Sequence, residues 1–296
     1  MRLVMFEYNG KVRLGALTDD SQGARLVDLN AGPRRLPGDL LLLICAGASA
    51  LGPARQALLT ADKAQFIPMD QVTLMAPIPR PGKILCLGHN YKGHLGIGRT
   101  EQPEYPTIFS KTANTVTGHG RPIVIPGASS QVDFEAELGV VIGRGGRNIP
   151  EAEAMEHVAG YTICNDVSAR DYQKRTSQWM IGKSFDTFLP MGPALVTPDE
   201  IPNVYALELS LTLNGIERQH TNTREMIFPI AFLIAYLSAV MTLDPGDVIL
   251  TGTPAKLPST SQAPAFMRPG DVVEIRIEML GTLRNPVVAE PRMGLV

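Results

Sequence analysis

The run VDFEAELGVVIG, residues 132–143, alternates between two kinds of side chain and therefore predicts one β-strand. Its odd positions place Asp133, Glu135 and Glu137 on one face, while the even positions place Val, Phe, Ala, Leu and Ile on the other. Two interpretations are open. Either the strand turns its acidic side to water, or the acids are ligands of a hard cation, which prefers oxygen atoms.

Composition excludes several classes of protein. The 296 residues are 44% hydrophobic, which is enough for one large domain or two with a proper core. A formal net charge of -2 and the lack of a basic run argue against nucleic-acid binding. The first residues soon reach Glu7 and Lys11, so they lack the apolar stretch of a signal peptide.

The three cysteines indicate a compartment. Cys45, Cys86 and Cys164 are odd in number, widely spaced and set in apolar surroundings, and they form no CxxC pair. This pattern is typical of reduced thiols in a protein core. We therefore expect a cytoplasmic protein.

One apolar segment raises the question of a membrane. Residues 226–243 carry no charge, and 18 residues is the lower edge of spanning length. Pro229 lies near its start, Tyr236 and Ser238 lie inside it, and LDPGD ends it without a basic flank. These features favour a helix buried all round in a large core, so we expect no contact with a membrane.

The order of the predicted elements indicates two domains. The first 30 residues form short alternating runs separated by turn residues, which predicts a small hairpin-rich sheet, and helical segments follow. The run PIPRPGK, residues 77–83, breaks any regular element and is typical of a linker. Many short strands come after it. We expect a β-rich α+β protein with a small N-terminal domain, residues 1–76, and a larger domain, residues 77–296.

Common catalytic motifs are absent. Gly182-Lys183-Ser184 ends like a phosphate-binding loop, but Ser177 stands where that motif needs its first glycine. The sequence contains no GxSxG elbow, no complete GxGxxG and no HExxH. A second acidic position remains: an apolar run ends in Asn165-Asp166. Asp166 at a strand end is either a metal ligand or a helix N-cap.

The segments around these acids carry a specific resemblance. The sequence resembles the fumarylacetoacetate hydrolase family, of the bacterial acylpyruvase or diketo-acid hydrolase type, over about residues 80–290. Six segments match in order: DFEAELGVVIG, NDVSARDYQ, GKSFDTFLPMGP, NTREMIFPI, MTLDPGDVILTGTP and GTLRNPVV. The resemblance implies a mixed β-roll catalytic domain with a small N-terminal α+β domain, a homodimer, and a divalent cation, usually Mg²⁺ with Mn²⁺ or Ca²⁺ as alternatives.

The resemblance also assigns roles to residues. It implies that Glu135, Glu137 and Asp166 hold the metal and that Lys183 is catalytic. In GHNYKGH it places the catalytic base at His94. It further implies that three residues face the substrate, which are Tyr91, Gln173 and Thr253.

The implied activity is cleavage of a carbon-carbon bond. The family members hydrolyse 2,4-diketo acids such as acylpyruvates, fumarylpyruvate or fumarylacetoacetate, through an enolate that the cation and the lysine stabilise. Oxaloacetate decarboxylation and enol-keto isomerisation are alternatives with the same enolate. A relative that binds a keto acid without turning it over is a third interpretation.

Two departures from the family pattern bear on that choice. Many relatives carry a glutamate three residues after the histidine, where this sequence has Ile97. A histidine without a carboxylate partner is a weaker base, although Glu101 or Glu104 from the same loop could replace it. After TGTPA the sequence continues with Lys256-Leu257-Pro258 in place of a glycine-rich segment, so the substrate cannot be carried over from relatives.

Overall fold

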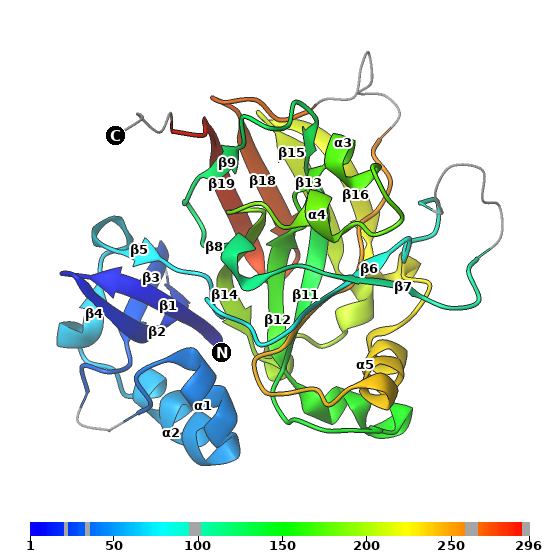
Figure 1. Cartoon of the computed structure of the whole chain (residues 1–296). Helices are drawn as coiled ribbons and strands as arrows, with labels where there is room; N and C mark the ends of the chain where they lie inside the picture. The colour runs from blue at the N-terminus through cyan, green and yellow to red at the C-terminus, as the bar shows by residue number, and fades with distance from the viewer. Residues whose placement is uncertain (21–22, 33–35, 95–101, 258–265, 292–296) are drawn as a thin grey trace, which may run out of the picture.

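A computed structural model describes residues 1–20, 23–32, 36–94, 102–257 and 266–291 (Figure 1). Strands predominate, in sheets of twelve, five and two strands. The prediction of a β-rich α+β protein is therefore confirmed. Within these ranges, seven short 3-10 helices connect elements: Lys63–Gln65, Met69–Gln71, Ala113–Thr115, Glu151–His157, Pro198–Glu200, Val204–Ala206 and Thr223–Glu225.

The N-terminal segment forms the expected antiparallel hairpins, coloured blue in Figure 1. Its strands are β1 (Arg2–Tyr8), β2 (Lys11–Asp20), β3 (Gly23–Asp28), β4 (Phe66–Ile67) and β5 (Thr73–Leu74). Two helices follow β3, namely α1 (Leu40–Ala46) and α2 (Ala48–Leu59). The side chain of Asp39 caps α1 by accepting a hydrogen bond from the Leu42 N–H at 2.8 Å.

This segment continues a sheet of the larger part. Strand β1 pairs antiparallel with β14 (Leu189–Val196), with Arg2 opposite Val196 and Leu3 opposite Leu195. No strand or helix lies between Leu74 and Ile84 of the described chain, where the proline-rich linker was expected. The division into residues 1–76 and 77–296 stays a prediction, because one sheet crosses it.

The large sheet has the order β4-β3-β2-β1-β14-β12-β11-β17-β6-β7. In addition, β5 pairs with β1 and β8 pairs with β14. Its remaining strands are β6 (Ile84–Gly88), β7 (Thr107–Ser110), β8 (Val116–Thr117), β11 (Ala136–Ile142), β12 (Val158–Asn165) and β17 (Val248–Leu250). Side chains of β11 alternate between two cores. Leu138, Val140 and Ile142 lie in the core toward the five-stranded sheet, whereas Val141 lies in the core shared with α1.

The five-stranded sheet completes the roll, in the order β16-β15-β18-β19-β9. Its strands are β9 (Ile123–Ile125), β15 (Glu208–Leu213), β16 (Ile216–Asn222), β18 (Val272–Ile277) and β19 (Gly281–Ala289). A small ladder pairs β10 (Val132–Asp133) with β13 (Ser168–Ala169), beside the one-turn helices α3 (Arg170–Gln173) and α4 (Met180–Lys183). The site described below lies at this ladder.

The long apolar segment contains a shorter helix than expected. Helix α5 spans Ile230–Val240 and buries one side, through Ile230, Leu233, Ile234, Leu237 and Ser238. Val240 is 67% exposed, so the expectation of a helix buried all round is wrong. Among the described residues, the apolar helices all fall short of what a membrane crossing needs.

Candidate metal centre and active-site cavity

The acidic run forms two strands where the sequence predicts one. β10 ends at Asp133 and β11 begins at Ala136, with Glu135 in the break between them. The exposed fractions are 4% for Asp133, 7% for Glu135 and 1% for Glu137. The interpretation of an acidic face in water is therefore wrong. Like charges buried this deeply need cations beside them.

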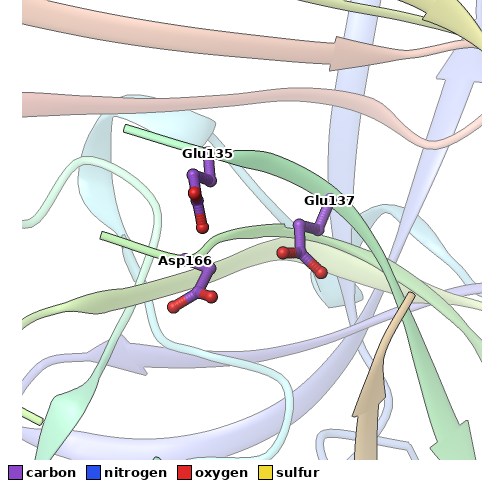
Figure 2. Close-up of side chains that lie close together, drawn as sticks. All are labelled: Glu135, Glu137 and Asp166. Carbon is purple, nitrogen blue, oxygen red and sulfur yellow. The ribbon is translucent and has the colours of Figure 1, made fainter. Parts of the chain in front are cut away.

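Glu135, Glu137 and Asp166 converge on one place. One ligand oxygen from each lies within 4.8 Å of the others, and Figure 2 shows the three carboxylates close together. Backbone contacts produce this arrangement: the Asp166 N–H donates to the Glu135 carbonyl at 2.9 Å, and the Glu135 N–H donates to Asn165 Oδ1 at 3.0 Å. Asp166 is not a helix N-cap, because the cap of α3 is Ala169.

The turn after β17 holds Glu137. Its Oε2 accepts a hydrogen bond from the Gly252 N–H at 2.6 Å. Gly252 has a φ of +96°, and a Cβ there would lie 2.9 Å from Cβ of Asn90, so the turn requires glycine. The Asn90 side chain bonds the backbone of Thr251 and Phe228. These bonds tie the GHNYKGH segment to the TGTP turn.

Two buried lysines face the acids. Lys183 Nζ donates to Glu135 Oε2 and Asp166 Oδ2, each at 2.6 Å. Lys111 Nζ donates to Asp166 Oδ1 at 2.7 Å and to the Val167 carbonyl at 3.1 Å. The side-chain exposed fractions of Lys111 and Lys183 are 0% and 2%. Lys183, the predicted catalytic lysine, thus lies directly against two of the predicted metal ligands.

These neighbours make the acids electrostatically different. Burial by itself raises the pKa of Glu135, but the charges of Arg170 and Lys183 outweigh burial and lower that pKa below its usual value. Burial raises the pKa of Glu137 well above its usual value, and the nearby charges of Asp166 and Glu135 raise it further. Burial opposes the charged form of Lys183, yet Asp166 and Glu135 raise its pKa overall. Glu137 is the acid least compensated by a basic neighbour.

The acid trio fits a divalent cation. All three donors are carboxylate oxygens, the ligands that Mg²⁺, Mn²⁺ and Ca²⁺ prefer. Ligands of an octahedral Mg²⁺ are about 3 Å apart in neighbouring positions and about 4 Å apart in opposite ones, so oxygens that lie within 4.8 Å of one another would move closer to bind one ion. Burial and the neighbouring acids raise the pKa of Glu137, and a bound cation would favour its charged form. Glu135, Glu137 and Asp166 would hold the ion and leave coordination positions for a ligand.

A cavity of about 690 Å³ opens beside this cluster. Of the acids, Glu135 and Asp133 line it, together with the bases Arg170, Lys174, Lys183 and Lys256. Gln173, Thr253 and His94 line it too. The structure therefore brings these three predicted site residues to the same cavity as Lys183.

His94 is held by a backbone carbonyl. Its Nδ1 lies 2.9 Å from the Thr253 carbonyl oxygen, which can only accept, so Nδ1 carries a proton and Nε2 is the acceptor atom of the neutral ring. Thr253 is itself fixed, because its Oγ1 accepts a hydrogen bond from Gln219 at 2.9 Å. No carboxylate within the described residues forms a hydrogen bond or ion pair with His94. Ile97 and Glu101 lie outside the described residues, and Glu104 is exposed.

The other predicted substrate contacts differ from one another. Gln173 is the last residue of α3 and accepts a hydrogen bond from Arg170 Nη1 at 2.9 Å. Tyr91 is fully buried, and burial raises the pKa of its phenol. It is not among the described residues that line the cavity. Its role as a substrate contact stays a prediction.

Sequence reasoning missed three residues of this site. Arg170 Nη2 lies 2.5 Å from Glu135 Oε1, and Lys111 bonds Asp166 as described above. Trp179, the only tryptophan, lines the cavity with its ring centroid 5.6 Å from that of His89. Arg170 stands inside the matched segment NDVSARDYQ, which was a usable signal. Nothing local distinguishes Lys111 from an ordinary lysine after a strand.

Comparisons with known proteins show the family of this chain. The family model for the C-terminal domain of fumarylacetoacetate hydrolase matches residues 83–288. The mitochondrial oxaloacetate tautomerase of Xenopus laevis is 44% identical over 293 residues, which is 97% of this chain and 90% of that protein.

Solved structures share the fold. A fumarylacetoacetate hydrolase from Exiguobacterium antarcticum superposes with a TM-score of 0.83 at 33% identity, covering 98% of this chain and all of that one. A maleylpyruvate hydrolase from Sphingobium, in complex with Mn²⁺ and pyruvate, has a TM-score of 0.80 at 31% identity over the same shares. Together with the acid trio, this neighbour supports a divalent metal.

The prediction of a cytoplasmic location is contradicted, because the Xenopus relative is named as a mitochondrial protein. The prediction depended on reduced cysteines and on the missing signal-peptide pattern, and neither separates the cytosol from another reducing compartment. The cysteines are free, and Cys86 and Cys164 are buried as expected. Cys45 is exposed, so its placement in the core was wrong.

The matched segments, the mixed β-roll and the agreement with family structures over nearly the whole chain lead to one conclusion. The chain is an enzyme that belongs to the fumarylacetoacetate hydrolase family.

Proposed function

We propose that this protein interconverts the keto and enol forms of oxaloacetate or a closely related 2-keto dicarboxylic acid, with Mg²⁺ at Glu135, Glu137 and Asp166. The observation that carries the proposal is the contact of His94 Nδ1 with the Thr253 carbonyl. It presents Nε2 as a base inside the cavity, with no carboxylate partner among the described residues. Keto-enol interconversion needs one base to transfer a proton at carbon and no activated water.

The residues divide the reaction between them. Arg170 and Lys183 lie beside Glu135 and would hold the carboxylate of the keto acid. His94 Nε2 would take a proton from the carbon next to the keto group. The cation, when bound, supplies a Lewis acid that favours the negatively charged keto oxygen.

Lys183 would stabilise the same oxygen. The pKa of Lys183 is raised, so its ammonium stays charged and donates a hydrogen bond to the oxygen as negative charge develops there. The proton that His94 Nε2 took from carbon would then be given to that oxygen, which forms the enol and restores the histidine. The substrate gains and loses no atoms, so the reaction needs no activated water.

The relative from Xenopus supports this proposal, because it is an oxaloacetate tautomerase and its similarity extends over 97% of the present chain. A second candidate is hydrolysis of an acylpyruvate-like diketo acid, supported by the likeness to the maleylpyruvate hydrolase. Both reactions pass through an enolate. They differ in whether water attacks a second carbonyl group.

One experiment tests both functions. Purified protein with Mg²⁺ is given the enol form of oxaloacetate, and the loss of enol absorbance is compared with the uncatalysed rate, while NMR identifies the products. We expect faster ketonisation with oxaloacetate retained. Formation of pyruvate and carbon dioxide would indicate a decarboxylase instead.

The controls separate the remaining alternatives. Acetylpyruvate cleaved to acetate and pyruvate would favour the hydrolase. His94→Asn should lower the rate by about 10²–10⁴-fold if His94 transfers the proton. No turnover of either substrate, with binding of oxalate and Mg²⁺ retained, would leave the protein as a binder that is catalytically silent.

A further inference from the structure

We infer that Lys256 determines substrate specificity by binding the second carboxylate of a dicarboxylic keto acid. The inference rests on the proposed function, since it concerns the end of the substrate far from the reacting carbon. It makes a monocarboxylic keto acid the poorer ligand of this cavity.

Lys256 lines the same cavity as Glu135. Its Nζ forms an ion pair with Asp133 Oδ1, and Asp133 Oδ2 accepts from Arg170 Nε at 2.9 Å. Arg170 in turn reaches Glu135 at 2.5 Å. Asp133 therefore pairs with two basic side chains. Arg170 also contacts Glu135 of the metal cluster, and Lys256 is one ion pair further away.

The ammonium of Lys256 has donors left for a ligand. A lysine has three N–H donors, and Asp133 takes one of them. The Lys256 side chain is 36% exposed, whereas that of Asp133 is 5% exposed. An anion entering the cavity can therefore reach Lys256 without displacing Asp133.

The backbone fixes where this ammonium lies. Lys256 forms an antiparallel bridge with Gln219, and the Leu257 N–H donates to the Arg218 carbonyl at 2.9 Å. The Gln219 side chain also bonds Thr253 Oγ1 and the Pro254 carbonyl. Lys256 is thus attached to the strand that positions Thr253. A fixed cation loses less conformational entropy on binding than a free surface lysine.

The charges of the site favour a dianion. The described residues that line the cavity or bind the metal cluster include one more base than acid, with the histidines neutral. The bases are Lys111, Arg170, Lys174, Lys183 and Lys256, and the acids are Asp133, Glu135, Glu137 and Asp166. A divalent cation raises the excess to three positive charges. A dicarboxylate offsets more of that excess than a monocarboxylate does.

The path along the cavity matches such a substrate. A keto acid that binds through its carboxylate and keto group beside Arg170 and Lys183 leaves its other end to extend away from Glu135. The ion pairs run from Glu135 through Arg170 and Asp133 to Lys256, so Lys256 is the member of this series that is most contacts away from Glu135. Lys174 also lines the cavity but has no ion pair to Asp133, so it provides a matched control.

The test compares two substrates in four proteins. Wild type, Lys256→Met, Lys256→Arg and Lys174→Met are assayed with oxaloacetate and with its 4-methyl ester, which lacks the second charge. We expect Lys256→Met to raise KM for oxaloacetate by about 10–100-fold, the effect of losing one charge-assisted hydrogen bond. Its KM for the ester and its kcat should change less than threefold, and Lys256→Arg should recover most of the affinity.

The control variant separates a direct contact from a general charge effect. Lys174→Met removes the same charge from the cavity without an ion pair to Asp133, so it should raise KM for oxaloacetate slightly more than KM for the ester and far less than Lys256→Met does. The inference is overturned if Lys256→Met raises KM equally for both substrates. It is also overturned if Lys174→Met raises KM for oxaloacetate as much as Lys256→Met does.

A binding measurement keeps the inference separate from the proposed function. Trp179 is the only tryptophan and lines the cavity, so its fluorescence can report binding of pyruvate or oxaloacetate with Mg²⁺. Wild type should prefer oxaloacetate, and Lys256→Met should lose that preference. If wild type turns over no oxaloacetate but shows this loss, the proposed function fails and the inference stands. Equal affinity of wild type for both acids overturns the inference, even if the enzyme is active.

Discussion

Lys183 Nζ lies 2.6 Å from Asp166 Oδ2, and the same ammonium lies 2.6 Å from Glu135 Oε2. A buried lysine thus joins two acids that the sequence assigns to a metal. A cation at the acid trio would therefore neutralise the same carboxylates as the ammonium does. This relationship makes the stability of the protein depend on both.

Replacing Lys183 with Met should destabilise the metal-free protein by about 3–5 kcal/mol, because it leaves buried carboxylates without their partner. Mg²⁺ should restore much of that stability but not the activity. Thermal unfolding with chelator and with Mg²⁺ measures both. Lys92→Met is the control, since Lys92 pairs with Glu225 at 3.8 Å on the surface and should cost less than about 1 kcal/mol. Equal effects of the two variants would contradict the prediction.

Replacing Glu137 with Gln should abolish metal binding and make metal-free stability less sensitive to pH. The folded pKa of Glu137 is raised, so its favourable contribution is present below the unfolded value of about 4.3 and is lost as pH rises through the folded value. In chelator, the variant should therefore gain stability over wild type as pH rises above about 4.

Glu135→Gln should change the pH dependence of stability in the opposite direction. The pKa of Glu135 is lowered by Arg170 and Lys183, against the effect of burial. Its contribution is present above the unfolded value and is lost as pH falls through the folded value. This variant should be less stable than wild type near neutral pH, and the deficit should shrink in acid. Denaturant unfolding across pH checks both variants, and the same trend in the two would refute the assignment of charges.

Gly182 should tolerate no side chain. A Cβ at Gly182 would lie 2.4 Å from the backbone nitrogen of Gln173, so alanine must push α4 away from α3 and move Lys183. We expect Gly182→Ala to cost about 1–3 kcal/mol and to reduce turnover. Gly52→Ala is the control: it lies within α2 with no atom near its Cβ position, and it should stabilise the protein by up to about 1 kcal/mol. Calorimetry and initial rates compare the two.

Trp179 should report ligand binding. Its ring packs against His89 and Phe109 in the cavity, with centroid distances of 5.6 and 5.3 Å. Oxalate with Mg²⁺ should change its emission in the wild type, since the ligand would enter the space that the ring borders. Neither oxalate with chelator nor the Glu137→Gln variant should give that change. An equal change of emission without metal would mean that oxalate binds in the cavity independently of a cation at the acid trio.

The sequence by itself determined the acid trio and the elements that carry it. Alternation in residues 132–143 identified Glu135 and Glu137 as neighbours on one face, and the ordered segments identified Asp166, Lys183 and the family. These features are local, because strand periodicity and turn residues act over a few positions.

Only the tertiary structure decided what surrounds these residues. The break at Glu135 arises because β10 pairs with β13 while β11 pairs with β12. Lys111, Arg170 and Trp179 reach the site from other elements. Burial raises the pKa of Glu137, whereas the charges of Arg170 and Lys183 lower the pKa of Glu135 against the effect of burial. Burial, charge neighbours and cavity shape depend on contacts between residues far apart in the sequence, so no local pattern could reveal them.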